Sequence, residues 1–284
     1  MRRGFLGLLI AFSLPLLAQT IQLNDKTLDS ETPKLRVGKI AFDVEVRGVV
    51  NLRQSETWTV RNIAFVDGGQ IVIRNNNLSL TVQGAVTATS GVPIIVAFPP
   101  NEKAPDGADG APGRPGAPGG NGLAAGNVQL TFAQMPKSLL TLILAGQNGG
   151  NGGRGGRGID GAAGSMGEAA RSGGFNCLKA ATPGQAGRPG GSGGAGGAAG
   201  ACGRSGVLTL RGISPKLVDL RLNAASAGKP GMGGPGGSGG AGGAGGQGGG
   251  FCSAAPNGPN GAPGDRGLAG QRGETNCPPP LTYP

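Results

Sequence analysis

Glycine recurs at every third position through long stretches of the second half of this chain. The stretches are 107–122, 146–167, 191–206, 228–249 and 258–273, and none of them misses a step. A flexible linker needs no such register, whereas three residues per turn is the period of a polyproline-II-type helix. The register therefore predicts straight, extended segments and argues against a disordered tail.

Glycine content also divides the chain near residue 100. Only eight of the 62 glycines lie before residue 104. The part that follows has too few large apolar side chains to build an ordinary core. We expect three regions: a signal peptide over 1–18, a β-rich platform over 19–100, and a glycine-rich bundle over 101–284. Strand returns are expected within the bundle region at 127–145 and 207–223.

The front region reads as short β-strands. In "KIAFDVEV", apolar side chains alternate with polar or small ones at Ile40, Phe42, Val44 and Val46, the period of a half-buried strand. Short β-branched runs follow, separated by Gly or Asn, which suits the rungs of a parallel β-solenoid or a small sandwich.

Two apolar patches in the glycine-rich half repeat each other. They match at an offset of about 78 residues, which aligns Leu130 with Leu208 and Leu142 with Leu220. One pair of strands cannot bury its apolar face alone, so such units should stack on one another. The expected fold is all-β: a short parallel β-solenoid-like platform that carries a bundle of antiparallel polyglycine-II helices.

The number of glycines per triplet separates this bundle from collagen. Collagen needs one glycine per triplet and is rich in proline, whereas several stretches here carry two, as in "GGSGGAGGAGG". A second glycine is useful where a helix has close neighbours on two faces. We therefore expect 146–156, 190–197 and 231–249 inside the bundle, and 107–122 and 258–273 at its edge. The remaining positions, such as Arg154, Arg157, Ser238 and Ala241, should face solvent or a cleft. The first of six outgoing and returning segments should be the apolar stretch "GVPIIVAFPP".

The N-terminus has the features of an export signal. Arg2 and Arg3 precede the apolar run "FLGLLIAFSLPLLA", and Ala18 offers a cleavage site before Gln19. The run is too short to span a membrane comfortably, and no later segment has transmembrane length. We expect a secreted or cell-surface protein, with the periplasm as the alternative.

Export makes the four cysteines candidates for disulfides. A zinc site is the weaker interpretation because the chain has no His and no CxxC pair. Segments 146–167 and 228–249 leave the platform, and 184–206 and 258–273 return to it. Cys177 and Cys252 then lie at the far tip, and Cys202 and Cys277 near the base. Bonded cysteines need Cα atoms within about 7 Å, so we predict Cys177–Cys252 and Cys202–Cys277. A hairpin hidden within 184–202 would allow local pairing instead.

The triplets "GADGAPGRPGAPGGNG" and "GQNGGNGGRGGRG", together with the cysteines, resemble the glycine-rich springtail antifreeze proteins, which are bundles of antiparallel polyglycine-II helices. The register is also similar to that of the receptor-binding adhesins of phage tail-fibre tips and of bacterial exported proteins with glycine-rich excursions from a β-solenoid. The resemblance covers about residues 70–284. The chain departs from the antifreeze pattern in its separate β platform and its basic bundle.

Charge points to an anionic partner. The chain carries 25 Lys and Arg against 15 Asp and Glu, and most of the excess lies after residue 103. We expect an anionic polysaccharide or cell surface as the partner. The alternative is that the positive charge serves only solubility. Nucleic acid is disfavoured because the bundle has almost no aromatic residues for base stacking. The candidate anion-binding residues are Arg114, Arg154, Arg157, Arg188, Arg204, Arg266 and Arg272.

Catalysis has little support in the sequence. Without His there is no Ser-His or Cys-His nucleophile and no His metal site, and we expect no catalytic residue, cofactor or metal. A β-solenoid polysaccharide-active enzyme using carboxylates such as Asp43 and Glu45 is the remaining enzymatic alternative. Ice binding on a flat, uncharged face such as "GGSGGAGGAGG" is the other alternative function, although the arginines count against it.

Overall fold

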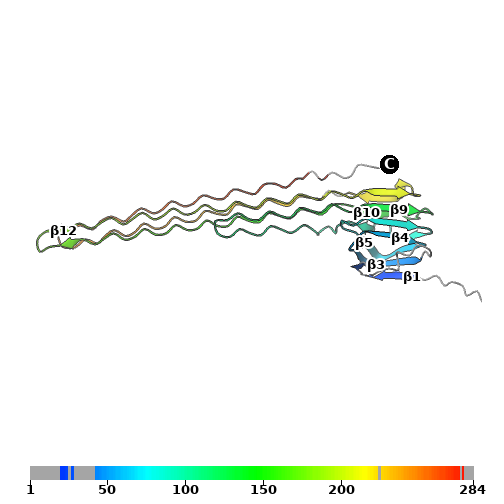
Figure 1. The fold of residues 1–284 in the computed structure, drawn as a ribbon, viewed down its shortest axis with the longest axis horizontal. Helices are drawn as coiled ribbons and strands as arrows, with labels where there is room; N and C mark the ends of the chain where they lie inside the picture. The colour runs from blue at the N-terminus through cyan, green and yellow to red at the C-terminus, as the bar shows by residue number, and fades with distance from the viewer. Residues whose placement is uncertain (1–19, 25–26, 29–41, 223–224, 276, 278–284) are drawn as a thin grey trace, which may run out of the picture.

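The computed structural model describes residues 20–24, 27–28, 42–222, 225–275 and 277. The expected signal peptide and Ile40 lie outside these residues. The described chain has two parts: a stack of β-strands at one end, called the platform below, and a long rod of extended chain that projects from it (Figure 1). It is all-β, and its one helical element is the short 3-10 turn Pro215–Leu217.

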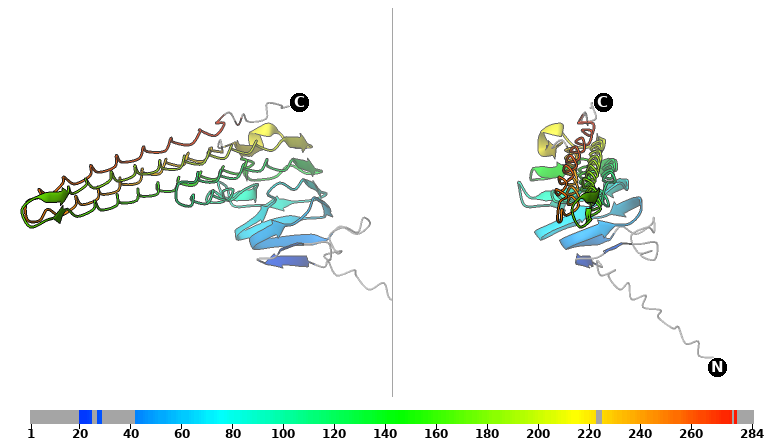
Figure 2. Two further views of the ribbon diagram at one scale, coloured as in Figure 1. Left: turned by 60° about the vertical axis from the view of Figure 1, so that its left-hand side comes forward. Right: turned by 90° about the vertical axis from the view of Figure 1, so that its left-hand side faces the viewer.

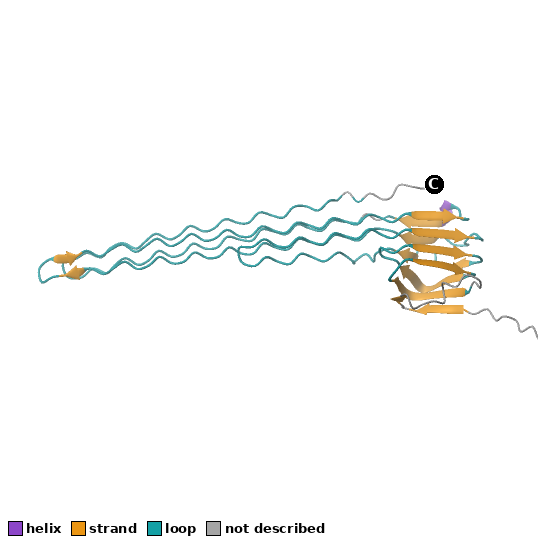
Figure 3. Ribbon diagram, in the orientation of Figure 1, coloured by secondary structure: helices purple, strands orange, loops and turns teal. Residues whose placement is uncertain are grey.

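The platform contains two parallel sheets. The larger sheet holds β1 (Thr20–Asn24), β2 (Thr27–Leu28), β3 (Asp43–Leu52), β5 (Ile63–Val72), β7 (Val86–Thr87), β8 (Pro93–Val96), β10 (Leu140–Ile143) and β14 (Val218–Arg221). The smaller sheet has the order β13 (Leu208–Arg211), β9 (Val128–Phe132), β6 (Leu78–Val82) and β4 (Glu56–Val60). From β3 onward the chain passes repeatedly from the larger sheet to the smaller and back, so that each passage stacks on the one before (Figure 3).

Alternating side chains from both sheets form one core. Trp58 of β4 pairs with Leu80, which pairs with Leu130, and all three are buried. From the larger sheet, Ile95 and Leu142 are adjacent and fully buried. The period-two alternation seen in the sequence thus places one face of every strand against the opposite sheet.

The stretch "GVPIIVAFPP" belongs to this core and not to the rod, so the prediction that it is the first outgoing segment was wrong. Ile94, Ile95 and Val96 form most of β8 and are all buried, Ile94 and Ile95 in the core of the platform. Consecutive β-branched residues without glycine pack well in a strand buried on both faces, and they have no place where backbones must touch.

The register of the repeat also differs in part from the prediction. Leu142 does pair with Leu220, 78 residues later. Leu208, however, pairs with Val128 and not with Leu130, an offset of 80. The loop between the two strands is two residues shorter in the second copy, and a single offset cannot describe both strands.

Within the residues that the structure describes, six extended segments make up the rod. They are segment I (104–112), II (115–126), III (145–170), IV (181–206), V (225–248) and VI (254–275), and successive segments run in opposite directions. Each pair of segments leaves the platform after a strand of the larger sheet and returns at its base (Figure 2). The rod therefore projects from one corner of the platform. An earlier connection from the larger sheet to the smaller one, between β5 and β6, is only a short turn.

Segments I and II correct the expectation that 107–122 is one edge run. Gly113 has a φ of 69°, and the Arg114 N–H donates to the Ala111 carbonyl at 2.8 Å. The chain turns there and comes back, so that the Ala117 N–H donates to the Ala108 carbonyl at 2.8 Å. The run is a short hairpin beside the first part of segments III and IV.

Backbone hydrogen bonds join the segments at every triplet. In segment IV, the Gly191 N–H donates to Ile159 of segment III at 2.7 Å, and the Gly190 N–H donates to Ala262 of segment VI at 2.9 Å. Glycine is required because the chains touch: a Cβ on Gly190 would lie 2.2 Å from the Gly237 carbonyl oxygen. The rod is thus held by main-chain contacts with almost no side-chain core.

Two disulfides tie the rod at its ends. Cys177 bonds to Cys252 with Cα atoms 5.0 Å apart, and Cys202 bonds to Cys277 with Cα atoms 6.1 Å apart. These are the two pairs expected from the directions of the segments. The first lies at the far tip, beside the hairpin of β11 (Arg171–Ser172) and β12 (Cys177–Lys179) (Figure 1).

Candidate functional site

The outward positions of the triplets form the accessible surface of the rod. Two positions of a triplet face neighbouring segments wherever neighbours are present, and the third faces solvent. Arg154, Arg157, Ser238 and Ala241 are all exposed, as predicted. Side chains at these positions therefore lie outside the close backbone contacts between segments.

The structure brings three of the seven candidate arginines together. The Gly156 N–H donates to the Arg114 carbonyl at 2.9 Å, beside the end of the first hairpin. Hydrogen bonds from the same hairpin reach the carbonyls of Arg154 and Arg157 at 2.8 and 2.7 Å. These three residues, called the hairpin-end cluster below, surround the point where segments I and II stop.

The other four arginines lie apart from the hairpin-end cluster and from one another. Arg188 is on segment IV, Arg266 and Arg272 are on the last segment, and Arg204 is near the platform. All four are exposed. The seven residues therefore do not form one patch, because they are spread over the turn at Gly113 and over segments III, IV and VI.

Acidic neighbours partly balance the hairpin-end cluster. Arg157 donates to Asp160 at 3.0 Å and to the Ser238 hydroxyl at 3.3 Å. The backbone N–H of Ser238, followed by the charge of Arg157, holds the pKa of Asp160 below its ordinary value. The guanidinium groups of Arg114 and Arg154 have no partner among the described residues. They are the cations of this cluster that are free to meet a ligand.

Asn and Asp side chains at outward positions have a role that the sequence reasoning missed. Asn148, Asn151 and Asp160 of segment III each accept a hydrogen bond from a backbone N–H of segment V, at 2.8, 2.9 and 2.7 Å. The acceptor and donor residues are 78 positions apart each time. These side chains satisfy backbone donors of the neighbouring segment. The signal available in the sequence was that all three occupy the same triplet position of segment III.

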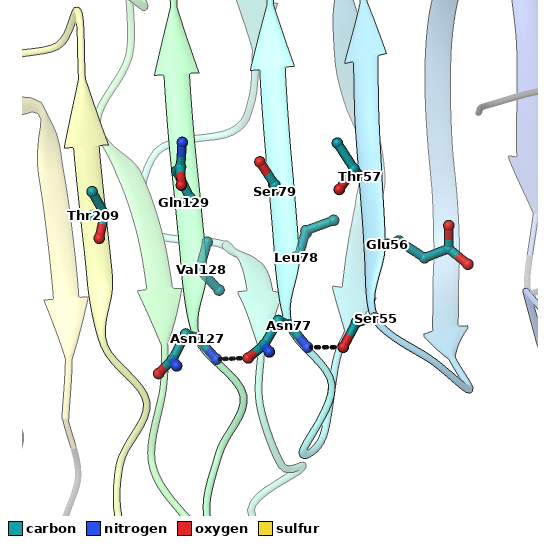
Figure 4. Close-up of a pocket in the computed structure, with 10 residues that line it drawn as sticks. All are labelled: Ser55, Glu56, Thr57, Asn77, Leu78, Ser79, Asn127, Val128, Gln129 and Thr209. Atoms are coloured by element: carbon teal, nitrogen blue, oxygen red, sulfur yellow. Dashed lines mark hydrogen bonds between the residues drawn. The ribbon is translucent and has the colours of Figure 1, made fainter. Parts of the chain in front are cut away.

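Polar side chains also accept backbone N–H groups of neighbouring strands on the platform, next to a shallow depression of about 280 Å³. There the Asn127 N–H donates to Asn77 at 2.8 Å and the Asn77 N–H donates to Ser55 at 3.0 Å (Figure 4). The depression is lined by Ser55, Glu56, Thr57, Asn77, Leu78, Ser79, Asn127, Val128, Gln129 and Thr209. Its outward row is polar and has no aromatic side chain.

The carboxylates considered for catalysis are engaged in ion pairs. Asp43 accepts two hydrogen bonds from the Arg61 guanidinium, at 2.9 and 2.7 Å. These bonds are the main reason that the pKa of Asp43 lies below its ordinary value. Glu45 pairs with Arg47. A general acid needs a raised pKa, so the environment of Asp43 does not suit that role.

The far tip of the rod carries apolar side chains that are exposed to solvent. Phe175 is 94% exposed, Leu178 66% and Phe251 62%. Phe65, Phe98 and Phe132 of the platform are at most 5% exposed. The sequence analysis took Phe175 and Phe251 only as neighbours of cysteines. Their exposure follows from the end of the rod, where no further segment exists to cover them.

Comparisons with known proteins include a weak likeness to a solved structure. No family model matches the chain, and a search of curated proteins also finds no match. Among solved structures, the springtail antifreeze protein from Granisotoma rainieri, described as a nine polyproline type II helical bundle, is 25% identical. That comparison covers 64% of this chain and 92% of the other, with a TM-score of 0.13. No helix in the described part of this chain is long and apolar enough to cross a membrane.

Proposed function

We propose that this chain is an exported, non-catalytic structural or adhesive surface protein. In this proposal a short parallel β-solenoid is the base, and the six segments are a bundle of polyglycine-II helices that carries basic side chains away from it. The hydrogen bonds that recur every third residue support the polyglycine-II assignment, since three residues per turn is the period of that helix. At a rise of 3.1 Å per residue, segment V is about 70 Å long.

The observation that carries the adhesive function is the hairpin-end cluster on the side of this rod. The guanidinium groups of Arg114 and Arg154 are exposed and have no partner among the described residues. Hydrogen bonds to neighbouring segments fix both backbones, and one of these bonds runs from the Arg154 N–H to the Asp109 carboxylate at 2.7 Å. Fixed cations on a rigid scaffold attract a polyanion without an ordering cost for the protein backbone. The ligand class that fits is an anionic polysaccharide, such as one on a cell surface.

A charge-matched comparison tests this function. The variant Arg114→Gln with Arg154→Gln and Arg157→Gln loses three positive charges from the hairpin-end cluster. The control loses three from the platform, at Arg53, Arg211 and Lys216, which are exposed. Binding of each protein to heparin and to whole cells is measured across a salt series.

The proposal requires the cluster variant to lose at least about tenfold in affinity for heparin, while the platform variant stays near wild type. Equal losses would mean that net charge alone drives the attraction, and the adhesive site would be refuted. Reducing and alkylating the two disulfides should also weaken binding, because the rod is expected to open while its charge is nearly unchanged.

Ice binding is the second candidate, and one observation favours it. Ser192, Ala195, Ser238 and Ala241 are small, uncharged and exposed on straight segments. A flat row of such residues suits an ordered water lattice better than a polyanion. Thermal hysteresis and crystal shape in a cooled droplet decide this candidate, which fails if both match a bovine serum albumin solution.

A further inference from the structure

The far tip of the rod is a small apolar surface with a fixed shape. Phe175 stands in the turn between β11 and β12, where the Gly173 N–H donates to the Asn176 carbonyl at 2.8 Å. Phe251 stands in a second turn, closed by two hydrogen bonds between Gly249 and Cys252 at 3.1 and 3.0 Å. The Cys177–Cys252 disulfide joins the two turns. The backbones of the turns that carry the two rings are therefore linked before any partner arrives.

The exposed apolar area at this point is unusual for a protein surface. A Phe side chain buries about 150–250 Å² when covered, so Phe175, Phe251 and Leu178 together present several hundred Å² of apolar surface. Exposed apolar surface of this extent, gathered at one end of a molecule, often marks an interaction site. No segment of the described chain covers them, and the rod holds them as far from the platform as the fold allows (Figure 1).

The charges around the tip are mainly positive. Residues 167–183 and 246–256 contain Glu168, Arg171 and Lys179 as their charged residues. Lys179 pairs with Glu168, and Arg171 is exposed without a partner among the described residues. The apolar side chains thus stand next to one free cation and one paired cation, with no unpaired carboxylate near them.

We propose that the tip inserts Phe175, Phe251 and Leu178 into the interface of an anionic lipid bilayer. The rod ends in projecting turns. Projecting apolar side chains can insert into a lipid bilayer without the complementary surface that a protein partner requires. Aromatic and aliphatic side chains favour the headgroup and acyl boundary, and a neighbouring Arg adds attraction to anionic lipid. This inference rests on the proposed adhesive role and gives it a second contact, at the end of the rod.

A second copy of the chain is a poorer occupant of the tip. Two tips docked end to end would bury about 1,000 Å² at most, below the range of stable protein interfaces. A lipid surface has no such minimum, because each inserted side chain contributes separately through its buried area.

Vesicle binding tests the proposal with the purified, disulfide-bonded protein. The variant Phe175→Ser with Phe251→Ser is compared with Leu268→Ser, which removes a side chain that is 79% exposed on the flank of the rod. Partition is measured on phosphatidylcholine vesicles with and without phosphatidylglycerol. We expect the tip variant to lose about tenfold or more in partition to the anionic vesicles and Leu268→Ser to behave as wild type.

A fluorescent reporter places the tip directly. Trp58, the only Trp of the chain, is 0% exposed, so its emission should not respond to vesicles. Phe175→Trp should shift its emission to the blue with anionic vesicles and be quenched by brominated acyl chains. No shift, or equal partition of the tip variant and wild type, would overturn the proposal.

The two proposals can fail separately. Heparin binding tests the hairpin-end cluster and uses no lipid, whereas vesicle binding tests the tip and uses no polysaccharide. If wild-type protein binds cells through Phe175 but ignores protein-free vesicles of either composition, the tip takes a protein partner and the lipid assignment is wrong.

Discussion

Gly237 lies in the crowded middle of the rod, where one added methyl group should destabilise the protein. A Cβ on Gly237 would lie 2.2 Å from the carbonyl oxygen of Ile159, where ordinary contact is 3.4–4 Å. Relief requires segments III and V to separate by more than 1 Å. The Gly237 N–H donates to Gly191 at 2.8 Å, and its carbonyl accepts from Gly264 at 2.8 Å. Losing these two bonds and overpacking the site should lower the free energy of unfolding by about 2–6 kcal/mol for Gly237→Ala.

The adjacent residue supplies the control. Ser238 is exposed, and Ser238→Ala adds no atom to the contact between segments, so its free energy of unfolding should stay within about 0.5 kcal/mol of wild type. Denaturant unfolding of the oxidised proteins measures both values, and hydrogen exchange of the 184–206 amides locates the damage. If Gly237→Ala unfolds with the same free energy as Ser238→Ala, the segments do not pack at backbone contact and the account of the glycines is wrong.

Three further outcomes follow from the same contacts. Gly156→Ala should destabilise the protein by about 2 kcal/mol, whereas Ile159→Ala, three residues on, should be nearly neutral, and calorimetry compares the two. Replacing Cys202 and Cys277 together by Ser opens a loop of 75 residues and should cost up to about 4.5 kcal/mol in denaturant unfolding. The pKa of Asp160 is lowered, so its stabilisation is present above the ordinary Asp value of 3.8 and is lost as pH falls below it. Asp160→Asn keeps an acceptor for the same N–H, and its melting temperature should fall less steeply in acid than that of wild type.

The distribution of glycine predicted the packing of the rod because a glycine stands where the backbone of a neighbouring segment comes close. In segment III, Gly150, Gly153 and Gly156 face segment I, and a Cβ on any of them would lie within 2.0 Å of a carbonyl oxygen there. The pattern then changes from two glycines per triplet to one, and Ile159 takes the next such position. The change falls where the hairpin of segments I and II ends, so the sequence of one segment records the length of another.

The same signal could not reveal the turn at Gly113. That residue stands in the unbroken step of three, yet its φ of 69° makes it the turn of a hairpin. A glycine needed for close approach of two backbones and a glycine needed for a positive φ cannot be told apart in the sequence. The positions of the arginines were hidden for a related reason. Arg114 lies near Arg157 because the chain turns at Gly113, whose N–H donates to the Arg157 carbonyl at 2.7 Å. Arg188 lies apart from them because the hairpin does not reach it.

Segment VI differs from the earlier segments at the triplet position through which each of them approaches the next segment. Each segment approaches the next one in the chain through one glycine of its triplets, as Gly190 of segment IV does toward segment V. The equivalent positions of segment VI are occupied by Asn257, Asn260, Pro263 and Arg266. Two of these side chains, Asn257 and Asn260, instead accept backbone N–H groups of segment V at 2.9 Å, and proline has no N–H to offer a further segment. A seventh segment, from this chain or from another copy, would meet side chains where it needs bare backbone, so the choice of residues at one triplet position sets the width of the rod.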